Sequence, residues 1–294
     1  MIAVEGLTKR YGKTLAVDDL SFKIEPGQVT GFLGPNGAGK TTTLRILLDL
    51  VKATSGTATI DGQRYRDLAD PAKRVGSVLE ATNFHPGRKG RNHLRVLAQP
   101  QGIAESRVNE LLELVDLADA AKKRVKTYSL GMRQRLTIAG ALLGDPEVLI
   151  LDEPANGLDP EGIRWLRGFL RGLAERGRTV LVSSHVLSEM AQLADRVVII
   201  HRGRLISHTS LAEILARAEG GVRVRSPQAE QFRAVLSSAG FESTETSPGM
   251  LAIKDAPIER VGELAAHNQI VLHELSPESA SLEEIFLELT GDAT

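Results

Sequence analysis

The sequence predicts an α/β protein in two parts. The larger part is a core of parallel strands that begins with an antiparallel β segment and contains a helical insertion, and the smaller part is a C-terminal α+β unit. Strand and helix patterns alternate up to about residue 215 and then change to the order β-α-β-β-α-β. Residues 221–294 carry a net charge of −7, whereas residues 1–220 carry +6. A chain of 294 residues is long enough for one large and one small domain.

The first elements are predicted from the spacing of apolar residues. Residues 2–12 and 17–24 alternate apolar and polar side chains, as half-buried antiparallel strands do. Residues 28–34 form an apolar strand pattern that runs into a glycine-rich turn. Residues 38–51 follow with apolar side chains at helical spacing, which predicts that a helix begins directly after the turn.

The middle of the chain predicts a helical insertion and then a return to the parallel sheet. The pattern is largely helical from about residue 83 to 145, and residues 105–124 place apolar side chains on one helical face. A further helix is predicted through residues 165–173. Three apolar runs predict buried strands, namely residues 148–151, 179–184 and 196–201. Because crossover connections join these strands, we expect them to be parallel.

The C-terminal unit is predicted from six short patterns in the order of a ferredoxin-like βαββαβ fold. They are a strand at 221–226, a helix at 229–240, strands at 241–246 and 250–254, a helix at 258–268 and a strand at 270–275. A last helix is predicted over 281–290, because Ser281 is an N-cap candidate and glutamates occupy the first turn.

Composition excludes several kinds of protein. The chain has no cysteine, which rules out disulfides and thiolate metal sites. Its net charge of −1 lacks the basic excess of a nucleic-acid binder, so we expect no nucleic-acid partner. The N-terminal residues lack the pattern of a secretory signal, and the longest apolar runs are too short to span a bilayer. We therefore expect any membrane role to depend on a partner protein.

The first functional motif, GPNGAGKT, lies between a predicted strand and a predicted helix. Its spacing, G-x-x-x-x-G-K-[ST], lets successive main-chain N–H groups surround a phosphate at a helix N-terminus, where the helix dipole favours an anion. We expect Lys40 to neutralise the β- and γ-phosphate oxygens of a nucleotide and Thr41 to ligate Mg²⁺. The predicted nucleotide-binding residues of this motif are Gly34, Pro35, Asn36, Gly37, Ala38, Gly39, Lys40, Thr41 and Thr42.

The second motif is an apolar strand that ends in two carboxylates, VLILDEP. Asp152 is expected to hold Mg²⁺ through water, and Glu153 to act as a general base or to position a water in line with the γ-phosphate. The sequence has no Asn-Lys-x-Asp guanine-reading motif, which argues against a GTPase. Together the two motifs predict a P-loop nucleotide hydrolase.

With these motifs in place, residues 1–215 resemble the ATP-binding subunits of ABC transporters motif by motif. The family has a signature, Leu-Ser-Gly-Gly-Gln, ahead of the acidic strand, and this chain has YSLGM there. The resemblance implies that Ser129, Leu130 and Gly131 contact an ATP held by another copy of the chain. Tyr128, Leu130 and Met132 depart from the family pattern.

Three further positions match the same family. The resemblance implies that Tyr11 stacks on adenine and that Asp159, in NGLDP, signals across a dimer interface. It also implies that His185, in VLVSSHVLSEM, is the switch histidine, which orients the attacking water and the γ-phosphate and so joins Glu153 as a catalytic residue.

One departure from the family pattern points to a particular subgroup of the family. The family usually has a glutamine where the core enters its helical subdomain, and this chain has Glu80 there. A carboxylate keeps an oxygen for Mg²⁺ but adds negative charge. Exporters that confer bacitracin and daunorubicin resistance often carry glutamate at this place, and the C-terminal SLEEIFLELT is similar to the ending of that group.

The resemblance implies an ABC ATP-binding domain at residues 1–215, with the helical subdomain at about 83–145, and an accessory domain at 221–294. We expect a subunit that binds and hydrolyses ATP with Mg²⁺ as a homodimer or pseudo-dimer. It is expected to bind separate transmembrane permease subunits at the cytoplasmic face of a bacterial membrane and to power export of a drug or other small molecule. The alternatives are an importer ATPase, a soluble ABC-type ATPase acting on ribosomes or DNA, and a non-hydrolysing nucleotide sensor.

Overall fold

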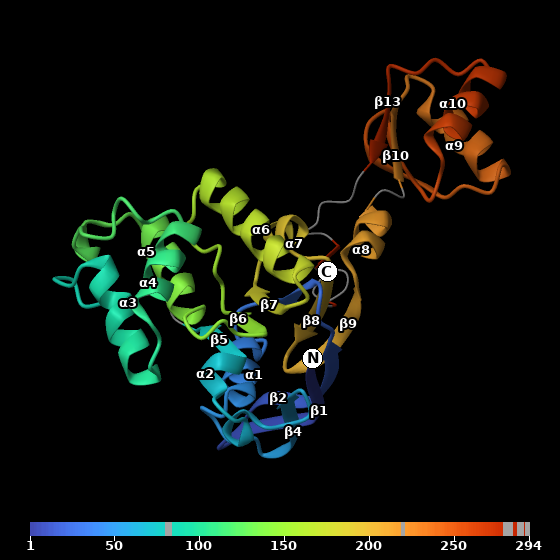
Figure 1. The fold of residues 1–294 in the computed structure, drawn as a ribbon. Helices are drawn as coiled ribbons and strands as arrows, with labels where there is room; N and C mark the ends of the chain where they lie inside the picture. Colours follow the sequence, from blue (N-terminus) through green and yellow to red (C-terminus); the bar gives the residue numbers. More distant parts are fainter. Residues whose placement is uncertain (80–83, 219–220, 279–284, 287–290, 292–294) are drawn as a thin grey trace. The chain divides into compact units, whose positions relative to one another are not determined.

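The computed structural model of the chain describes residues 1–79, 84–218, 221–278, 285–286 and 291 (Figure 1). The chain forms two compact units, Met1–Ser210 and Leu211–Thr294. Helix α8 (Leu211–Ala218) falls in the second unit, whereas the predicted first domain ran to residue 215. Among the described helices, none combines the length and the apolar character that crossing a bilayer requires.

The first unit is built on a mixed sheet with the strand order β5-β6-β7-β3-β8-β9. Its strands are β3 (Val29–Leu33), β5 (Val75–Val78), β6 (Val148–Leu151), β7 (Thr179–Ser184), β8 (Arg196–His201) and β9 (Arg204–Ser210). Strands β8 and β9 pair antiparallel, and the other neighbours pair in parallel. Every residue of β3, β6 and β7 is buried, which explains why these strands read as largely apolar runs. Because β6, β7 and β3 are neighbours, the residues that follow them meet at one edge of the sheet.

A three-stranded antiparallel sheet in the order β2-β1-β4 packs against this core. It contains β1 (Ile2–Tyr11), β2 (Thr14–Ile24) and β4 (Ser55–Ile60). Its inward side chains, such as Leu7 and Leu20, share one hydrophobic cluster with Phe32 of β3. The remaining helices of the core are α1 (Lys40–Leu47), α2 (Pro71–Arg74), α6 (Pro160–Glu175) and α7 (Leu187–Leu193).

The helical insertion lies between β5 and β6, as the sequence predicts. Its helices are α3 (Gly90–Ala98), α4 (Glu105–Leu114) and α5 (Leu130–Ala141), and they lie together on one side of the first unit (Figure 1). The helical pattern over residues 105–124 is formed only in its first half, because α4 ends at Leu114. Asp116 has a φ of 57°, a left-handed conformation that cannot continue an α-helix. Beyond it, Leu117, Ala120 and Ala121 are buried but lie outside any helix.

The second unit contains a four-stranded antiparallel sheet in the order β11-β12-β10-β13. Its elements are β10 (Gly221–Arg225), α9 (Ala229–Ser238), β11 (Ser243–Ser247), β12 (Met250–Lys254), α10 (Ile258–His267) and β13 (Glu274–Glu278). Phe232, Val224 and Ile253 are buried between helices and sheet. The element order is that of the predicted βαββαβ unit.

The last strand of this unit begins later than predicted. The sequence pattern placed it at residues 270–275, whereas β13 spans Glu274–Glu278. The main-chain N–H of Ile270 donates to the carbonyl of Ala265, and Gln269 has a φ of 56°, so these residues end α10. The predicted helix at 281–290 and its cap Ser281 lie largely outside the described residues.

Candidate functional site

The glycine-rich loop connects β3 to α1 at the carboxyl edge of the sheet. Gly39 is the N-cap of α1 with a φ of 104°, a conformation that favours glycine, and a Cβ there would lie 2.5 Å from the carbonyl oxygen of Ala16. A Cβ on Gly34 would lie 2.5 Å from the carbonyl oxygen of Ile200. The loop is therefore tightly seated, and its main chain leads directly into the N-terminus of α1, where an anion is favoured.

Lys40 lies at the centre of this loop. Its side chain is buried, and its ammonium donates hydrogen bonds to the carbonyl oxygens of Gly34, at 2.6 Å, and Pro35, at 3.3 Å. Burial lowers the pKa of Lys40, and the neighbouring carboxylates of Glu153 and Asp152 oppose that change. A buried cation held over a helix N-terminus fits the phosphate group that the motif predicts.

Three oxygen-bearing side chains from different elements meet near this lysine. The Thr41 hydroxyl, on α1, donates to Asp152 Oδ2 at 2.9 Å, and Asp152 directly follows β6. The Ser183 hydroxyl, at the end of β7, donates to Asp152 Oδ1. Hydroxyl and carboxylate oxygens are the ligands that Mg²⁺ prefers, and such sites commonly use one or two protein ligands together with substrate phosphates. The side chains of Thr41 and Asp152 therefore fit the predicted metal.

Glu153 is fixed by several groups at once. Its φ is 49°, and its main-chain N–H donates to Ser183 Oγ at 2.9 Å. The Asn156 side-chain amide donates to Oε2, and His185 Nδ1 lies 3.2 Å from Oε1. Lys40 Nζ lies 3.7 Å from the same Oε1. A carboxylate, a histidine and a buried lysine thus converge, as the orientation of a water beside a phosphate requires.

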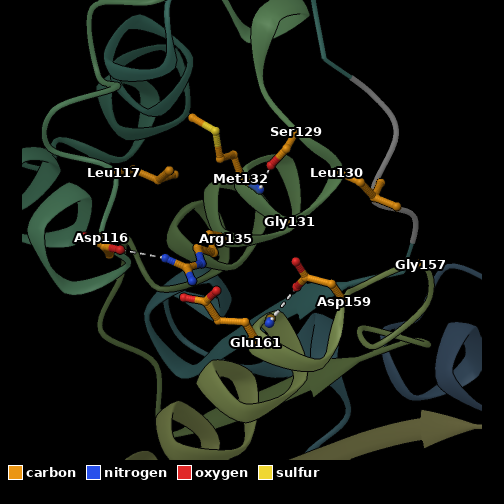
Figure 2. Close-up of a pocket in the computed structure, with 11 residues that line it drawn as sticks. Asp116, Leu117, Ser129, Leu130, Gly131, Met132, Arg135, Gly157, Asp159 and Glu161 are labelled. Carbon is orange, nitrogen blue, oxygen red and sulfur yellow. Dashed lines mark hydrogen bonds and ion pairs between the residues drawn. The ribbon is translucent and has the colours of Figure 1, made fainter.

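The signature residues lie in a second place within the first unit, a pocket of about 450 Å³ that Figure 2 shows. Ser129 is the N-cap of α5, and its Oγ accepts a hydrogen bond from the N–H of Met132 at 3.2 Å. Asp159 is the N-cap of α6, and its Oδ1 accepts from the N–H of Gly162 at 2.8 Å. Two helix N-termini therefore open on one pocket, which suits a negatively charged ligand. The lining residues are Asp116, Leu117, Ser129, Leu130, Gly131, Met132, Arg135, Gly157, Asp159, Glu161 and Gly162.

The structure thus groups the predicted residues into two clusters. Lys40, Thr41, Asp152, Glu153 and His185 form one, and the signature residues with Asp159 form the other. The remaining loop residues, namely Gly34, Pro35, Asn36, Gly37, Ala38, Gly39 and Thr42, lie between β3 and the first turn of α1.

Tyr11 makes its described contact outside these clusters. Tyr11 is at the end of β1 and is 47% exposed, with the Lys9 ammonium 4.7 Å from its ring centroid. An exposed ring suits stacking, although its partner here is a lysine. Glu80 lies outside the described residues.

Comparison with known proteins decides the family. Residues 17–156 match a family model described as ABC transporter, and residues 220–283 match a domain of unknown function. The chain is 39% identical over 295 residues to the uncharacterised ABC transporter ATP-binding protein YhcH of Bacillus subtilis, covering 99% of this chain and 96% of that protein. It is 38% identical over 303 residues to the bacitracin transport ATP-binding protein BcrA of Bacillus licheniformis, covering 100% and 98%. The chain belongs to the ATP-binding subunits of ABC transporters.

A solved structure supports the same family. A dimeric ATP-binding cassette in a post-hydrolysis state with bound ADP and Pi has 25% identity and a TM-score of 0.64, covering 72% of this chain and 99% of that one. The predicted P-loop fold class is thereby confirmed, and this ABC subunit is an ATPase.

Several residues of this ABC subunit escaped the sequence prediction. Ser183 and Asn156 contact the acid pair, yet each looks like an ordinary strand or loop residue in sequence. The sequence signal that could have identified Ser183 is its position. It is a polar residue at the end of an apolar strand, and that strand pairs with the strand that precedes the acid pair. Tyr128 is buried, and its hydroxyl donates to the carbonyl of Ala120 at 2.7 Å. The departure from the family signature at Tyr128 is therefore a packing feature of the helical insertion.

Proposed function

We propose that this chain powers a bacterial exporter of an antibiotic or similar small molecule. The observation that supports export is similarity to a bacitracin transport ATP-binding protein along the whole chain, C-terminal unit included, rather than over the ATPase core alone. An importer ATPase is the alternative within transport, and a soluble ABC-type ATPase is the alternative outside it. The C-terminal unit is proposed as an accessory domain of the same subunit.

The proposed working form is a head-to-tail homodimer. In it, the glycine-rich loop of one copy and the pocket around Ser129 and Asp159 of the other copy enclose one ATP. Support comes from the two separate clusters within a single chain, each of which presents a helix N-terminus suited to a phosphate group. The dimeric cassette with ADP and Pi, a relative of this chain, is consistent with such an assembly.

The roles proposed for the first cluster follow from its contacts. Lys40 neutralises the β- and γ-phosphate oxygens. Mg²⁺, when bound, would be held by Thr41 and Asp152, with Glu80 as a third candidate, and supplies positive charge to the phosphate oxygens. Glu153 orients the attacking water and accepts its proton, while Asn156 holds the other carboxylate oxygen.

His185 completes this arrangement. Its Nδ1 is directed to Glu153 Oε1, which leaves Nε2 for the γ-phosphate. The remaining proposed nucleotide contact is Tyr11, whose exposed ring suits stacking on adenine.

The proposed partners are separate transmembrane permease subunits, and the proposed location is the inner face of the cell membrane. Closure of the dimer on ATP would change the conformation of these subunits, and hydrolysis would reset it. No nucleic-acid partner is proposed, since the chain has a net charge of −1.

The decisive experiment on the ATPase uses Glu153→Gln. This variant should bind ATP, lose turnover by at least about 100-fold, and elute as a dimer on a sizing column only with ATP. Adding Ser129→Arg should block the dimer while monomeric ATP binding persists. Parent-like hydrolysis by Glu153→Gln would refute the catalytic role, and an unchanged dimer in the double variant would refute the role of the pocket.

The exporter proposal needs a cellular test. Deleting the gene in its native host should increase sensitivity to a peptide antibiotic, and re-expression of the parent, but not of Glu153→Gln, should restore resistance. Co-purification from native membranes should recover a membrane-spanning subunit. Loss of nutrient uptake would instead identify an importer, and recovery with ribosomes or DNA would identify the soluble alternative.

A further inference from the structure

Arg135 lines the signature pocket and points toward Asp116 (Figure 2). Its Nη1 lies 2.9 Å from Oδ2 of Asp116, just beyond α4, and its guanidinium carbon lies 4.6 Å from the centroid of the Trp165 ring on α6. Arg135 follows the cap residue Ser129 by six positions on α5, and Trp165 follows the cap residue Asp159 by six positions on α6. The contact between Arg135 and Trp165 therefore joins α5 and α6. It lies six residues beyond the cap of each helix, and both of these N-termini open on the pocket.

The environment of this guanidinium holds it in place. The Arg135 side chain is 18% exposed, whereas that of its partner Asp116 is 85% exposed. The indole ring, half-buried on α6, stacks on Phe169 with ring centroids 5.1 Å apart. A planar guanidinium lying on an anchored aromatic face has few alternative positions, so its charge is fixed at the wall of the pocket.

The charges that line the pocket explain why this position matters. Among the lining residues three are acidic, namely Asp116, Asp159 and Glu161, and Arg135 is the basic one. A nucleotide brings several negative charges on its phosphates to this wall. Without Arg135 the ionisable wall would be entirely acidic, and the two helix N-termini alone would have to offset it.

We propose that Arg135 is a positioning residue for the ATPase reaction. Fixed between Asp116 and Trp165, it offsets the acidic wall and sets the relative position of the N-termini of α5 and α6, so that the pocket accepts the phosphate end of an ATP held by a second copy. This inference rests on the proposed dimer. To the residues of that proposal it adds Arg135. This side chain supplies positive charge at the wall of the pocket and holds the helix N-termini that Ser129 and Asp159 cap.

The test measures ATP-driven dimerisation of the full chain in the Glu153→Gln background, alongside ATP binding by the monomer. Arg135→Gln should raise the ATP concentration for half-maximal dimerisation about tenfold, which corresponds to about 1.4 kcal/mol. Monomer binding should be unchanged. Arg135→Lys, which keeps the charge but loses the planar group that lies on Trp165, should fall between the parent and Arg135→Gln. Adding Asp116→Asn to Arg135→Gln should recover most of the loss, because it removes one acidic group from the same wall.

Arg133→Gln is the matched control, because it removes the same charge two residues away. Arg133 donates to the carbonyl of Lys126 and does not line the pocket, so this variant should dimerise like the parent. The defect of Arg135→Gln should also shrink as salt is added, as expected for repulsion at a solvent-accessible wall.

Three results would overturn the inference. They are parent-like dimerisation by Arg135→Gln, an equal defect in Arg133→Gln, and a defect that neither Asp116→Asn nor salt relieves. Failure of the Glu153→Gln background itself to dimerise with ATP would refute the proposed dimer instead.

Discussion

Ser183→Ala provides a quantitative test of how the acid pair is held. Ser183 is fully buried at the end of β7, where its hydroxyl donates to Asp152 Oδ1 and accepts the N–H of Glu153 at 2.9 Å. Alanine keeps the strand intact but removes both hydrogen bonds. Asp152 retains a second donor in Thr41, whereas the Glu153 N–H loses the acceptor described for it.

The magnitude follows from these two losses. A hydrogen bond to a charged group contributes about 1.5–3 kcal/mol, and a buried donor left without an acceptor costs about 1–3 kcal/mol. Removing a small polar side chain from a buried site recovers part of that cost. We therefore expect the free energy of unfolding of the first unit to fall by about 3 kcal/mol. Turnover should fall at least about tenfold, since Glu153 is no longer fixed at its main chain.

Urea unfolding followed by tryptophan fluorescence measures this directly. Trp165 is the only tryptophan in the sequence, and it lies in the unit Met1–Ser210, so the signal reports that unit alone. Ser184→Ala is the matched control. Its hydroxyl is also buried, but it donates to Glu189 Oε2 at 2.7 Å, away from the acid pair. Ser184→Ala should lose stability and keep turnover. An unchanged urea midpoint for Ser183→Ala, or equal turnover losses in both variants, would refute the reasoning.

Two further predictions follow from buried groups. Gly90→Ala should destabilise the helical insertion by about 1–3 kcal/mol, because a Cβ would lie 2.1 Å from Tyr128 Oη; Tyr128→Phe should relieve part of the loss, and thermal unfolding of both variants checks this. Lys40→Met should abolish ATP binding without lowering the melting temperature of the nucleotide-free protein, because burial disfavours the ammonium and lowers its pKa. The parent should gain stability relative to Lys40→Met as pH rises from the lowered pKa of Lys40 to the unfolded value of about 10.4, because the unfolded chain binds more protons in that range. A Lys40→Met protein that melts earlier at pH 7, or one that ATP still stabilises, would contradict this prediction.

The sequence was sufficient for the parts whose signal is local. Largely apolar runs predicted β3, β6 and β7, because strands buried on both faces carry mostly apolar side chains. The glycine-rich loop was evident because its backbone conformation and close packing require particular residue types at fixed spacing. The family resemblance assigned an ABC-type fold in the same way, motif by motif.

Local patterns were insufficient where the chain ends one element and starts another. Residues 105–124 keep a helical period beyond Leu114, but the left-handed conformation of Asp116 ends α4. Ile270 looks like a strand residue, but its N–H caps α10 and its side chain joins the core of the second unit. In both cases a residue in a left-handed conformation ends the helix. The spacing of apolar residues continues past that point, so the spacing alone does not predict the helix end.

By itself the sequence determined the chemistry of this ABC subunit, because phosphate binding and hydrolysis require a few residue types at set positions along the chain. Only the tertiary structure decided which side chains support them. Ser183 and Asn156 reach the acid pair, and Asp116 and Trp165 hold Arg135, through contacts between segments that the linear pattern does not connect. Such contacts depend on the order of strands in the sheet and on where two helices begin. These are properties of the packed core, which the spacing of residues along the chain does not specify.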